Sequence, residues 1–515
     1  MPDRILRVIA GAGWRNWREP DFWLLAILTG GLVFRFSFFL KPYEWLVSFF
    51  TTDDFYYYAN TAYHIAMGNG STFDGGITYH NGFHPLFLSL LVPLFLIGLS
   101  KVTVVYITMV LLTGASLAMV VLAYRLGRQM GGGWLALATP VALAVGIYFV
   151  RLSFRGFETP IATALVLATF LAVVTDRPGW QIGLWLGLAG LARIDNGFVA
   201  VPVALYLLSH HRWRILCETA GVALALMAPW LIWSQSRFGS VLPVSGIAKA
   251  LHGELVHLWP GLAIFCREAT YTVAGEGWSD KIPPEIASAV GVLCVAEVAR
   301  QGRKTFWCTI YFLGLAAGYA ILTNPYYLHQ YVRYCVPAFT LLAVAFFAVS
   351  WRWQRFWLLL FTALVIGGNI GYVRMALRTP ALANYVGVCH REVPSILARV
   401  VGEHDLVGCF DSGTLGYYSP LPVVNLDGLA NAEVVRMLQS EEGDHWGVRY
   451  RRYFAMKGIT VLVGGMAFSW KNYFPDLDTW EVLHDPVPST SGGDVVFLRV
   501  PKLDDGVELG STPRP

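Results

Sequence analysis

Residues 102–124 read VTVVYITMVLLTGASLAMVVLAY, a run of 23 residues without a charged side chain. An apolar helix needs about 20 residues to cross the hydrocarbon core of a bilayer, so this stretch is long enough to span a membrane. The whole chain agrees, because 55% of its 515 residues are hydrophobic and only 14% are charged, against about 25% in soluble domains. The sequence therefore predicts a polytopic α-helical membrane protein.

Further apolar blocks of similar character bring the number of predicted membrane helices to about eleven. The predicted spans are 22–40, 102–124, 133–150, 158–175, 180–192, 197–209, 215–234, 286–299, 305–323, 334–350 and 356–373. The apolar stretch 84–100 contains two prolines, and we predict that it lies along the outer surface instead of spanning.

Clusters of lysine and arginine support that choice, because cytoplasmic loops carry an excess of them. If 84–100 does not span, one set of loops collects the N-terminal arginines and most later clusters. They are Arg4, Arg7, Arg15 and Arg18, then Arg125/Arg128, Arg177, Arg212/Arg214, Arg300/Arg303/Lys304 and Arg352/Arg355. The pattern predicts an uncleaved first helix, a cytoplasmic N-terminus and an extracytoplasmic segment after residue 373.

The first outer loop carries the most informative motif. Residues 51–87 read TTDDFYYYANTAYHIAMGNGSTFDGGITYHNGFHPLF. Adjacent carboxylates such as Asp53 and Asp54 raise each other's pKa, which leaves one of them poised as a base. Two other interpretations stay open: a site for a divalent cation such as Mg, Mn or Ca, or a polar helix end. The tyrosines that follow are typical of an interfacial aromatic belt.

The remaining outer loops also carry ionisable residues. They lie in the segments 151–158 and 193–196, at Lys249, and in the segment 329–333. Ionisable groups at membrane depth are costly and are usually functional, so their gathering on one face predicts a reaction site at the outer membrane–water boundary. The sequence has no basic stripe interleaved with aromatics, which argues against a nucleic-acid partner.

The composition changes at about residue 374. Short apolar runs, DLVGC at 405–409, ITVLV at 459–463 and DVVFLRV at 494–500, alternate with polar stretches. They predict a C-terminal extracytoplasmic α/β domain over 374–515, after a membrane domain over 1–373 whose first outer loop is 41–101. In the C-terminal domain, Asp411 and Asp427 are candidates for acceptor contacts or for turn residues, and Cys389 and Cys409 are candidates for a disulfide in an oxidising compartment.

Residues 51–87 resemble the first loop of the GT-C glycosyltransferases, multispanning enzymes that use polyprenyl-phosphate sugars. The succession of Asp53–Asp54, Gly68–Gly70 and Asn81 is similar to one branch, the membrane arabinofuranosyltransferases that cap mycobacterial cell-wall arabinan. Four later stretches resemble elements of that branch in the same order. They are FRGFETP (154–160), LARIDN (191–196), FGSVLPVSGIAKA (238–250) and YLHQYVRYCVPAF (327–339). Two features depart from the branch: His84–Pro85 is more like the protein mannosyltransferases, and the C-terminal domain is shorter.

The resemblance implies the GT-C fold and a multi-pass enzyme of a bacterial inner membrane. Such an enzyme moves a monosaccharide, with arabinofuranose as one candidate, from a polyprenyl-phosphate donor to a cell-envelope glycan, lipid or protein. Three alternatives stay open: a protein or lipid mannosyltransferase of the same superfamily, a transporter or flippase of lipid-linked sugar, and a non-catalytic assembly protein.

Glycosyl transfer needs a base for the acceptor hydroxyl and cationic or amide donors for the departing phosphate. Asp53 or Asp54 is the predicted base. The predicted phosphate partners are Lys249, Arg333, Arg193 and Arg155, with snorkelling toward lipid headgroups as the alternative. The predicted substrate contacts are Glu158, Asp195, Asn81, His84, Ser245 and His329. A helix-end role for Glu158 and an ion pair for Asp195 stay open beside them.

Overall fold

The computed structural model describes residues 19–250, 258–274, 281–322, 332–348, 353–378, 383–440, 445–465, 470–491 and 493–501. They divide into two compact units. We call Met1–Lys41, Ile107–Trp230 and His252–Arg378 the membrane unit, and Pro42–Tyr106, Leu231–Leu251 and Thr379–Pro515 the sheet unit. The first outer loop thus belongs with the C-terminal domain, although the sequence grouped it with the membrane helices. His329 lies outside the described residues.

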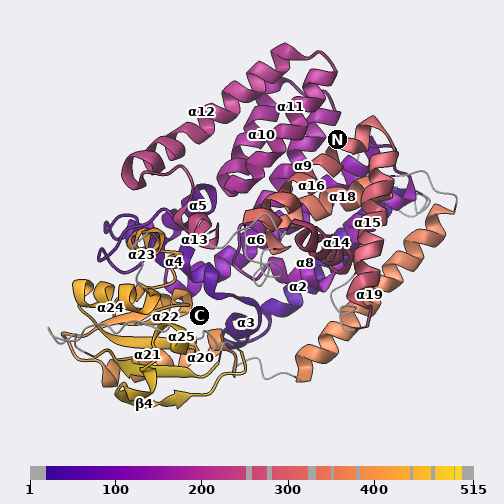
Figure 1. Cartoon of the computed structure of the whole chain (residues 1–515). Coiled ribbons are helices and arrows are strands. Elements are labelled where there is room, and N and C mark those ends of the chain that lie inside the picture. The colour runs from indigo at the N-terminus through magenta and orange to yellow at the C-terminus, as the bar shows by residue number, and fades with distance from the viewer. Residues whose placement is uncertain are drawn as a thin grey trace. The chain divides into compact units, whose positions relative to one another are not determined.

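A described helix corresponds to every predicted span (Figure 1). They are α2 (Pro20–Phe39), α6 (Lys101–Gln129), η2 (Trp134–Leu137) with α7 (Ala138–Val145) and α8 (Ile147–Leu152), α9 (Thr159–Val174), α10 (Gly179–Ala192), η3 (Ile194–Val199) with α11 (Ala200–Ser209), α12 (Trp213–Phe238), α15 (Pro284–Arg300), α16 (Arg303–Leu322), η6 (Val332–Cys335) with α18 (Val336–Phe347), and α19 (Gln354–Arg378). Four of the described helices, α2, α6, α12 and α19, are long and apolar enough to cross a membrane alone.

Helix α14 (Leu258–Ala274) is one that the sequence did not predict. It packs along α15 and α16 in the membrane unit. Arg267 and Glu268 interrupt its apolar run, so the helix lacks the uncharged block that predicts a membrane span. In the structure these two side chains form an ion pair of 2.7 Å with each other, so the helix carries no uncompensated charge there.

The predicted span 133–150 is a broken helix, with the break at Gly146 between α7 and α8. Asn369 of α19 bridges the break: its Oδ1 accepts from Ile147 N (2.9 Å) and its Nδ2 donates to Val145 O (2.7 Å). The fully buried guanidinium of Arg35 donates to Leu143 O (2.8 Å), one of the last carbonyls of α7. Backbone groups at a helix end need such partners where water is absent, so these two side chains stabilise the break.

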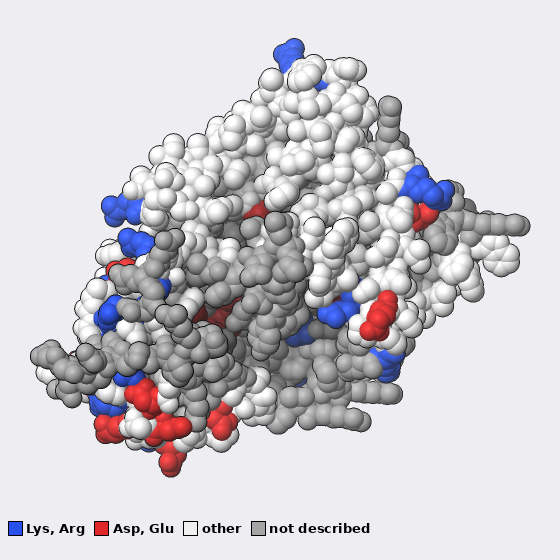
Figure 2. Space-filling view, viewed as in Figure 1, with Lys and Arg blue, Asp and Glu red and all other residues white. Residues whose placement is uncertain are grey.

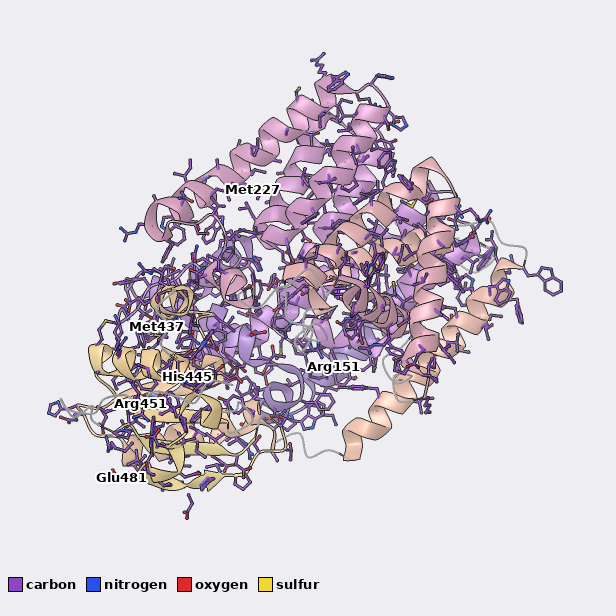
Figure 3. All side chains as sticks on the ribbon, viewed as in Figure 1. Arg151, Met227, Met437, His445, Arg451 and Glu481 are labelled. Carbon is purple, nitrogen blue, oxygen red and sulfur yellow. The ribbon has the colours of Figure 1, made fainter. Side chains whose placement is uncertain are left out.

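Helices α10 and α12 approach each other closely because α10 presents glycines to its neighbour. A side chain at Gly183 would meet the main chain of Thr219, and one at Gly190 would come within 2.8 Å of the Met227 sulfur (Figure 3). Small residues spaced four apart, here Gly179, Gly183 and Gly187, let helices in a membrane pack backbone to backbone. The packing explains why such a short helix as α10 is stable there.

The sheet unit combines the first-loop helices with the C-terminal α/β domain. Its elements are α3 (Tyr43–Phe50), α4 (Asp53–Ala66), α5 (Pro85–Leu96), α13 (Val244–Ala250), α20 (Tyr385–Arg391), α21 (Val393–Val400), β1 (Leu406–Cys409), α22 (Gly413–Tyr418), β2 (Val423–Asn425), α23 (Ala432–Gln439), α24 (Trp446–Lys457), β3 (Ile459–Gly465), α25 (Trp470–Tyr473), η8 (Leu477–Thr479), β4 (Val482–Val487) and β5 (Val495–Arg499). At 12 residues α5 is about 18 Å long, which is shorter than the hydrocarbon core; its location along the outer surface stays a prediction.

The five strands form one sheet in the order β2-β1-β3-β5-β4. Strand β1 is parallel to β2 and β3, whereas β5 is antiparallel to β3 and β4. The three predicted strands are β1, β3 and β5; β2 and β4 escaped prediction. In Figure 2 the described surface of this domain mixes acidic and basic side chains. The surface over α10, α11 and α12 shows almost no charged side chains.

Apolar clusters cover both faces of the sheet. Val407 and Cys409 point into one cluster with residues of α20 and α21, and Val424 and Leu462 point into another with residues of α24. Cys389 lies in the first cluster beside Cys409, but none of the seven cysteines forms a disulfide. The candidate pair Cys389–Cys409 is therefore not bonded, and both thiols act as small buried apolar groups.

Candidate functional site

Two acidic residues follow neighbouring parallel strands of the sheet. Asp411 comes two residues after the end of β1, and Asp427 comes two residues after the end of β2. The carboxyl ends of parallel strands meet at one edge of a sheet, which is where α/β domains bind their ligands. This edge is therefore where the C-terminal domain presents polar groups.

Asp53 of α4 occupies that edge. Its Oδ2 accepts from Gly413 N (2.8 Å) and its Oδ1 accepts from Thr414 N (2.7 Å). These are N–H groups of the first turn of α22, and such groups favour a negatively charged partner. A side chain at Gly413 would collide with the main chain of Asp53. Both carboxylate oxygens of Asp53 are thus committed to holding α4 against the C-terminal domain.

Tyr57 makes the second connection between α4 and the sheet edge. Its hydroxyl donates to Asp427 Oδ2 (2.8 Å) and accepts from Ser412 N (3.0 Å). The sequence suggested an interfacial aromatic here, with stacking on a sugar as the alternative. The spacing of four residues from Asp53, which places both side chains on one face of a helix, is the signal that identifies it.

Several carboxylates are crowded at this edge and partly shielded from water. Desolvation raises the pKa of Asp53 to about 6, although its hydrogen bonds to Thr414 and Gly413 act in the opposite direction. Desolvation likewise raises the pKa of Asp427 to about 7. For Asp411 desolvation and then the charge of Asp53 raise the pKa well above its usual range. Crowding of like charges in a low dielectric disfavours full ionisation of the group.

This crowding predicts a pH-dependent stability. A carboxyl whose folded pKa is raised binds more protons in the folded state, so its stabilising effect is complete below the unfolded pKa of about 4. That effect is lost as the pH rises through the folded value of about 7 at Asp427. The melting temperature should therefore fall between pH 5 and pH 8, and it should fall less in Asp427→Asn. Differential scanning fluorimetry measures both slopes, and equal slopes would contradict the assignment.

Lys249 and Ser245 lie on α13, in the same unit as Asp53 and Asp54. Asn81 fixes the start of this helix: its Nδ2 donates to Ser234 Oγ (2.6 Å) and to Leu242 O (3.2 Å), and its Oδ1 accepts from Val244 N (2.9 Å). The Asn81 side chain is only 1% exposed. The amide of Asn81 is therefore used within the fold, and a substrate contact of Asn81 stays a prediction.

His84 stands immediately before α5, where its carbonyl accepts from Leu88 N (3.2 Å). The side chain is partly buried. The location at a helix start explains His84 structurally, and a substrate contact stays a prediction.

In the membrane unit, Arg193 joins two predicted carboxylates. Its guanidinium donates to both oxygens of Asp195 (3.0 and 2.8 Å) and to Glu158. Tyr319 also donates to Asp195. The Arg193 and Glu158 side chains are only 4% and 3% exposed. These residues come from the start of α9, the junction of α10 and η3, and α16, so the arginine ties three segments together.

Arg333 belongs to the same cluster of the membrane unit. Its guanidinium lies 4.5 Å from the ring centroid of Phe157 and donates to the Tyr334 hydroxyl (2.9 Å). The Tyr334 ring in turn lies 4.1 Å from the guanidinium of Arg193. The structure thus brings Arg333 together with Glu158, Arg193 and Asp195, four of the residues that the sequence assigns to the site. Arg155 lies over the ring of Tyr148 at 5.7 Å.

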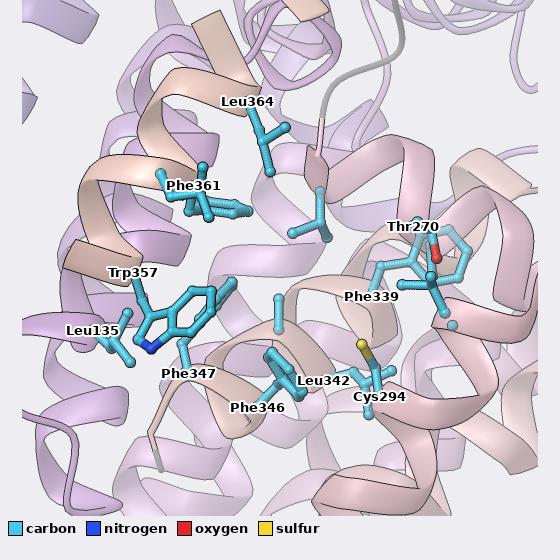
Figure 4. A pocket seen from close by; sticks show the side chains of 16 residues that line it. Leu135, Thr270, Cys294, Phe339, Leu342, Phe346, Phe347, Trp357, Phe361 and Leu364 are labelled. Carbon is cyan, nitrogen blue, oxygen red and sulfur yellow. The ribbon is translucent and has the colours of Figure 1, made fainter. Parts of the chain in front are cut away.

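A separate apolar cavity of about 460 Å³ lies within the membrane unit (Figure 4). Residues of α14, α15, α18 and α19 line it together with Leu135, and five of the lining side chains are aromatic. No charged side chain lines it, so it suits a hydrocarbon chain and not a reaction on a sugar.

As for metals, no group of three or more His, Cys, Asp or Glu among the described residues is placed to hold an ion. A cation at the Asp53–Asp54 pair stays a prediction.

Comparison with solved structures identifies the fold. Two crystal structures of ArnT from Cupriavidus metallidurans, one in the apo state and one bound to undecaprenyl phosphate, match with TM-scores of 0.58 and 0.56. They are 14% and 13% identical, and the matches cover 92% and 93% of this chain and 98% of each of theirs. The oligosaccharyltransferase AglB from Archaeoglobus fulgidus, in complex with an inhibitory peptide and a dolichol-phosphate, matches over 88% of this chain and 71% of its own at 11% identity, with a TM-score of 0.47.

Sequence comparison reaches only the C-terminal domain. Residues 381–496 match DUF8728, a domain of unknown function. No curated protein matches the chain.

The protein is thus a multi-pass membrane protein of the GT-C fold with a small C-terminal sheet domain, and the predicted fold class is confirmed.

Proposed function

We propose that this protein is a glycosyltransferase that moves a monosaccharide from a polyprenyl-phosphate donor to a cell-envelope acceptor. The observation that carries the proposal is the geometry of the acidic pair at the start of α4. Asp53 accepts two backbone N–H groups of α22, which fits a positioning role, and we therefore propose its neighbour Asp54 as the base. The GT-C fold supports the donor class, because one ArnT structure of that fold is bound to undecaprenyl phosphate.

In the proposed reaction, Asp54 is the base and Asp53 its positioning residue. The Asp54 carboxylate takes the proton of an acceptor hydroxyl while that oxygen forms a bond to the anomeric carbon of the donor sugar. The bond between the anomeric carbon and the phosphate oxygen breaks, and the electron pair leaves with the polyprenyl phosphate. A cation beside the phosphate stabilises the charge that develops.

Lys249 is the phosphate partner that we propose first, because it belongs to the same unit as Asp54. Arg333 and Arg155 of the membrane unit stay further candidates. Arg193 is a weaker candidate than the sequence suggested, because Glu158 and Asp195 already neutralise it. The same ion pairs favour structural roles for these two carboxylates over the predicted substrate contacts.

The proposed location is the outer face of a bacterial inner membrane, with the sheet unit outside. In this proposed topology α14 does not cross the bilayer, and the loop that carries Arg300, Arg303 and Lys304 faces the cytoplasm. Labelling of single cysteines placed in the C-terminal domain with an impermeant reagent in intact cells tests this orientation. Labelling only after permeabilisation would refute it.

Sugar transfer by the purified protein in detergent tests the function itself. A panel of polyprenyl-phosphate sugars should include arabinofuranose, which the first loop favours, and mannose, which His84–Pro85 favours. We expect turnover of one donor, lost in Asp54→Asn. If the protein instead moves the intact lipid-linked sugar between the leaflets of a liposome without cleaving it, the protein is a flippase.

A further inference from the structure

Asn81 connects two parts of the proposed site that are 163 residues apart in sequence. It belongs to the first loop, yet all three of its side-chain hydrogen bonds go to the segment 231–251. One of the acceptors, Ser234 Oγ, also donates to Ser240 O (2.7 Å), in the turn that follows α12. Asn81 thereby closes the turn between α12 and α13.

The bond to Val244 has a particular effect because Val244 is the first residue of α13. The first N–H groups of a helix have no partner inside the helix, and Asn81 Oδ1 accepts this one at 2.9 Å. An asparagine oxygen at such a position acts as an N-cap, supplied here by a distant part of the chain. Lys249 lies five residues further along the same short helix. The start of the helix that carries Lys249 is therefore set by Asn81.

On its other side, Asn81 is tied to the helix that carries the acidic pair. Gly82 N donates to His80 Nδ1 (3.1 Å), and His80 Nε2 contacts Thr61 Oγ1 (3.0 Å). Because Nδ1 accepts, the neutral ring carries its proton on Nε2 and donates to Thr61. Thr61 in turn donates to Tyr57 O (2.7 Å). Hydrogen bonds thus connect α4 to His80 and Gly82, the two chain neighbours of Asn81.

Close packing keeps this arrangement from shifting. Val244 packs against Ala432 and Val435 of α23. A side chain at Gly82 would collide with the main chain of Leu429 and come within 3.1 Å of Val244. The first loop, α13 and the C-terminal domain are therefore packed around one point, beside Asn81.

We infer that Asn81 is a positioning residue for donor binding, which holds Lys249 at a fixed place relative to Asp53 and Asp54. The inference rests on the proposed function, since it requires that Lys249 bind the donor phosphate. It differs from the sequence-based prediction in that Asn81 acts through Lys249 and makes no contact with the substrate.

A double-mutant cycle on donor binding tests the inference. The dissociation constant of undecaprenyl phosphate is measured for the wild type, Asn81→Ala, Lys249→Ala and the double variant. Loss of a charge-assisted phosphate contact should weaken binding about tenfold in Lys249→Ala, and Asn81→Ala should weaken it by a similar factor. If Asn81 acts through Lys249, the double variant binds no more weakly than Lys249→Ala alone.

Asn60→Ala provides the matched control. Asn60 is also a buried asparagine of the first loop, and its Nδ2 donates to Phe73 O (2.7 Å). This variant should lose thermal stability and keep the wild-type dissociation constant. Ser234→Ala, which removes only one acceptor of Asn81, should weaken binding in the same direction and keeps the test open if Asn81→Ala does not fold.

The outcomes separate the two proposals. Unchanged binding in Lys249→Ala refutes the phosphate role of Lys249, and with it the premise of the inference. Weaker binding in Lys249→Ala with wild-type binding in Asn81→Ala overturns the inference and leaves the proposed function standing. Additive effects in the double variant overturn it as well.

Discussion

Replacing Asp54 by asparagine is expected to lower kcat for sugar transfer by about a thousandfold, within the range for loss of a general base. The amide keeps the size of the side chain but does not accept the proton of the acceptor hydroxyl. The melting temperature and the affinity for undecaprenyl phosphate should stay near those of the wild type, because the donor contacts are unchanged. Single-turnover kinetics with saturating donor measures the chemical step alone.

Asp53→Asn is the control for this prediction. Its carboxylate accepts two N–H groups of α22, and an amide offers one oxygen and places an NH₂ group against the other N–H. We expect a lower melting temperature and a partial loss of turnover through misplacement of Asp54. If Asp53→Asn keeps its melting temperature and loses all turnover while Asp54→Asn stays active, the two roles are reversed.

Arg193→Leu is expected to destabilise the membrane unit by about 3–5 kcal/mol, the usual cost of breaking a buried ion pair from one side. The substitution leaves Glu158 and Asp195 without their cation in a place where the arginine is 4% exposed. A fall in the melting temperature in detergent measures the effect. Arg193→Lys should recover little of it, because an ammonium cannot reproduce the paired bonds to Asp195.

Arg212→Leu is the matched control in the same unit. Arg212 also pairs with an aspartate, Asp176, at 2.7 Å, but that aspartate is 64% exposed. An exposed pair is worth about 1 kcal/mol or less, so this variant should melt near the wild type. If Arg193→Leu also melts near the wild type and loses affinity for undecaprenyl phosphate, Arg193 is a phosphate ligand and not a structural residue.

The sequence predicts the membrane helices well because each long helix is a mainly apolar run with few charged side chains. It misses what depends on distant partners. The break between α7 and α8 requires Asn369 and Arg35, and neither lies near Gly146 in sequence. Helix α14 escapes because the adjacent charges of Arg267 and Glu268 look costly until their ion pair is known.

The candidate site shows the same division. Ionisable residues at the ends of apolar blocks predict one site on the outer face, and four of these residues, Glu158, Arg193, Asp195 and Arg333, come together in the membrane unit. Their roles do not follow from spacing, since only the ion pairs show that Arg193 is already neutralised. Likewise, nothing near Asp53 in the sequence reveals that its partners are the N–H groups of residues 413 and 414.

The hydrogen bonds of Asp53 to the first turn of α22 have a consequence for engineering this class of protein. The C-terminal domain uses the carboxyl edge of its sheet, where a free-standing α/β domain binds a ligand, to hold a residue of its own chain. A chimera that exchanges only the domain after residue 383 would place a foreign edge against Asp53 and Tyr57. Donor specificity should therefore be transferable between relatives only when the first loop and the C-terminal domain are exchanged as a pair.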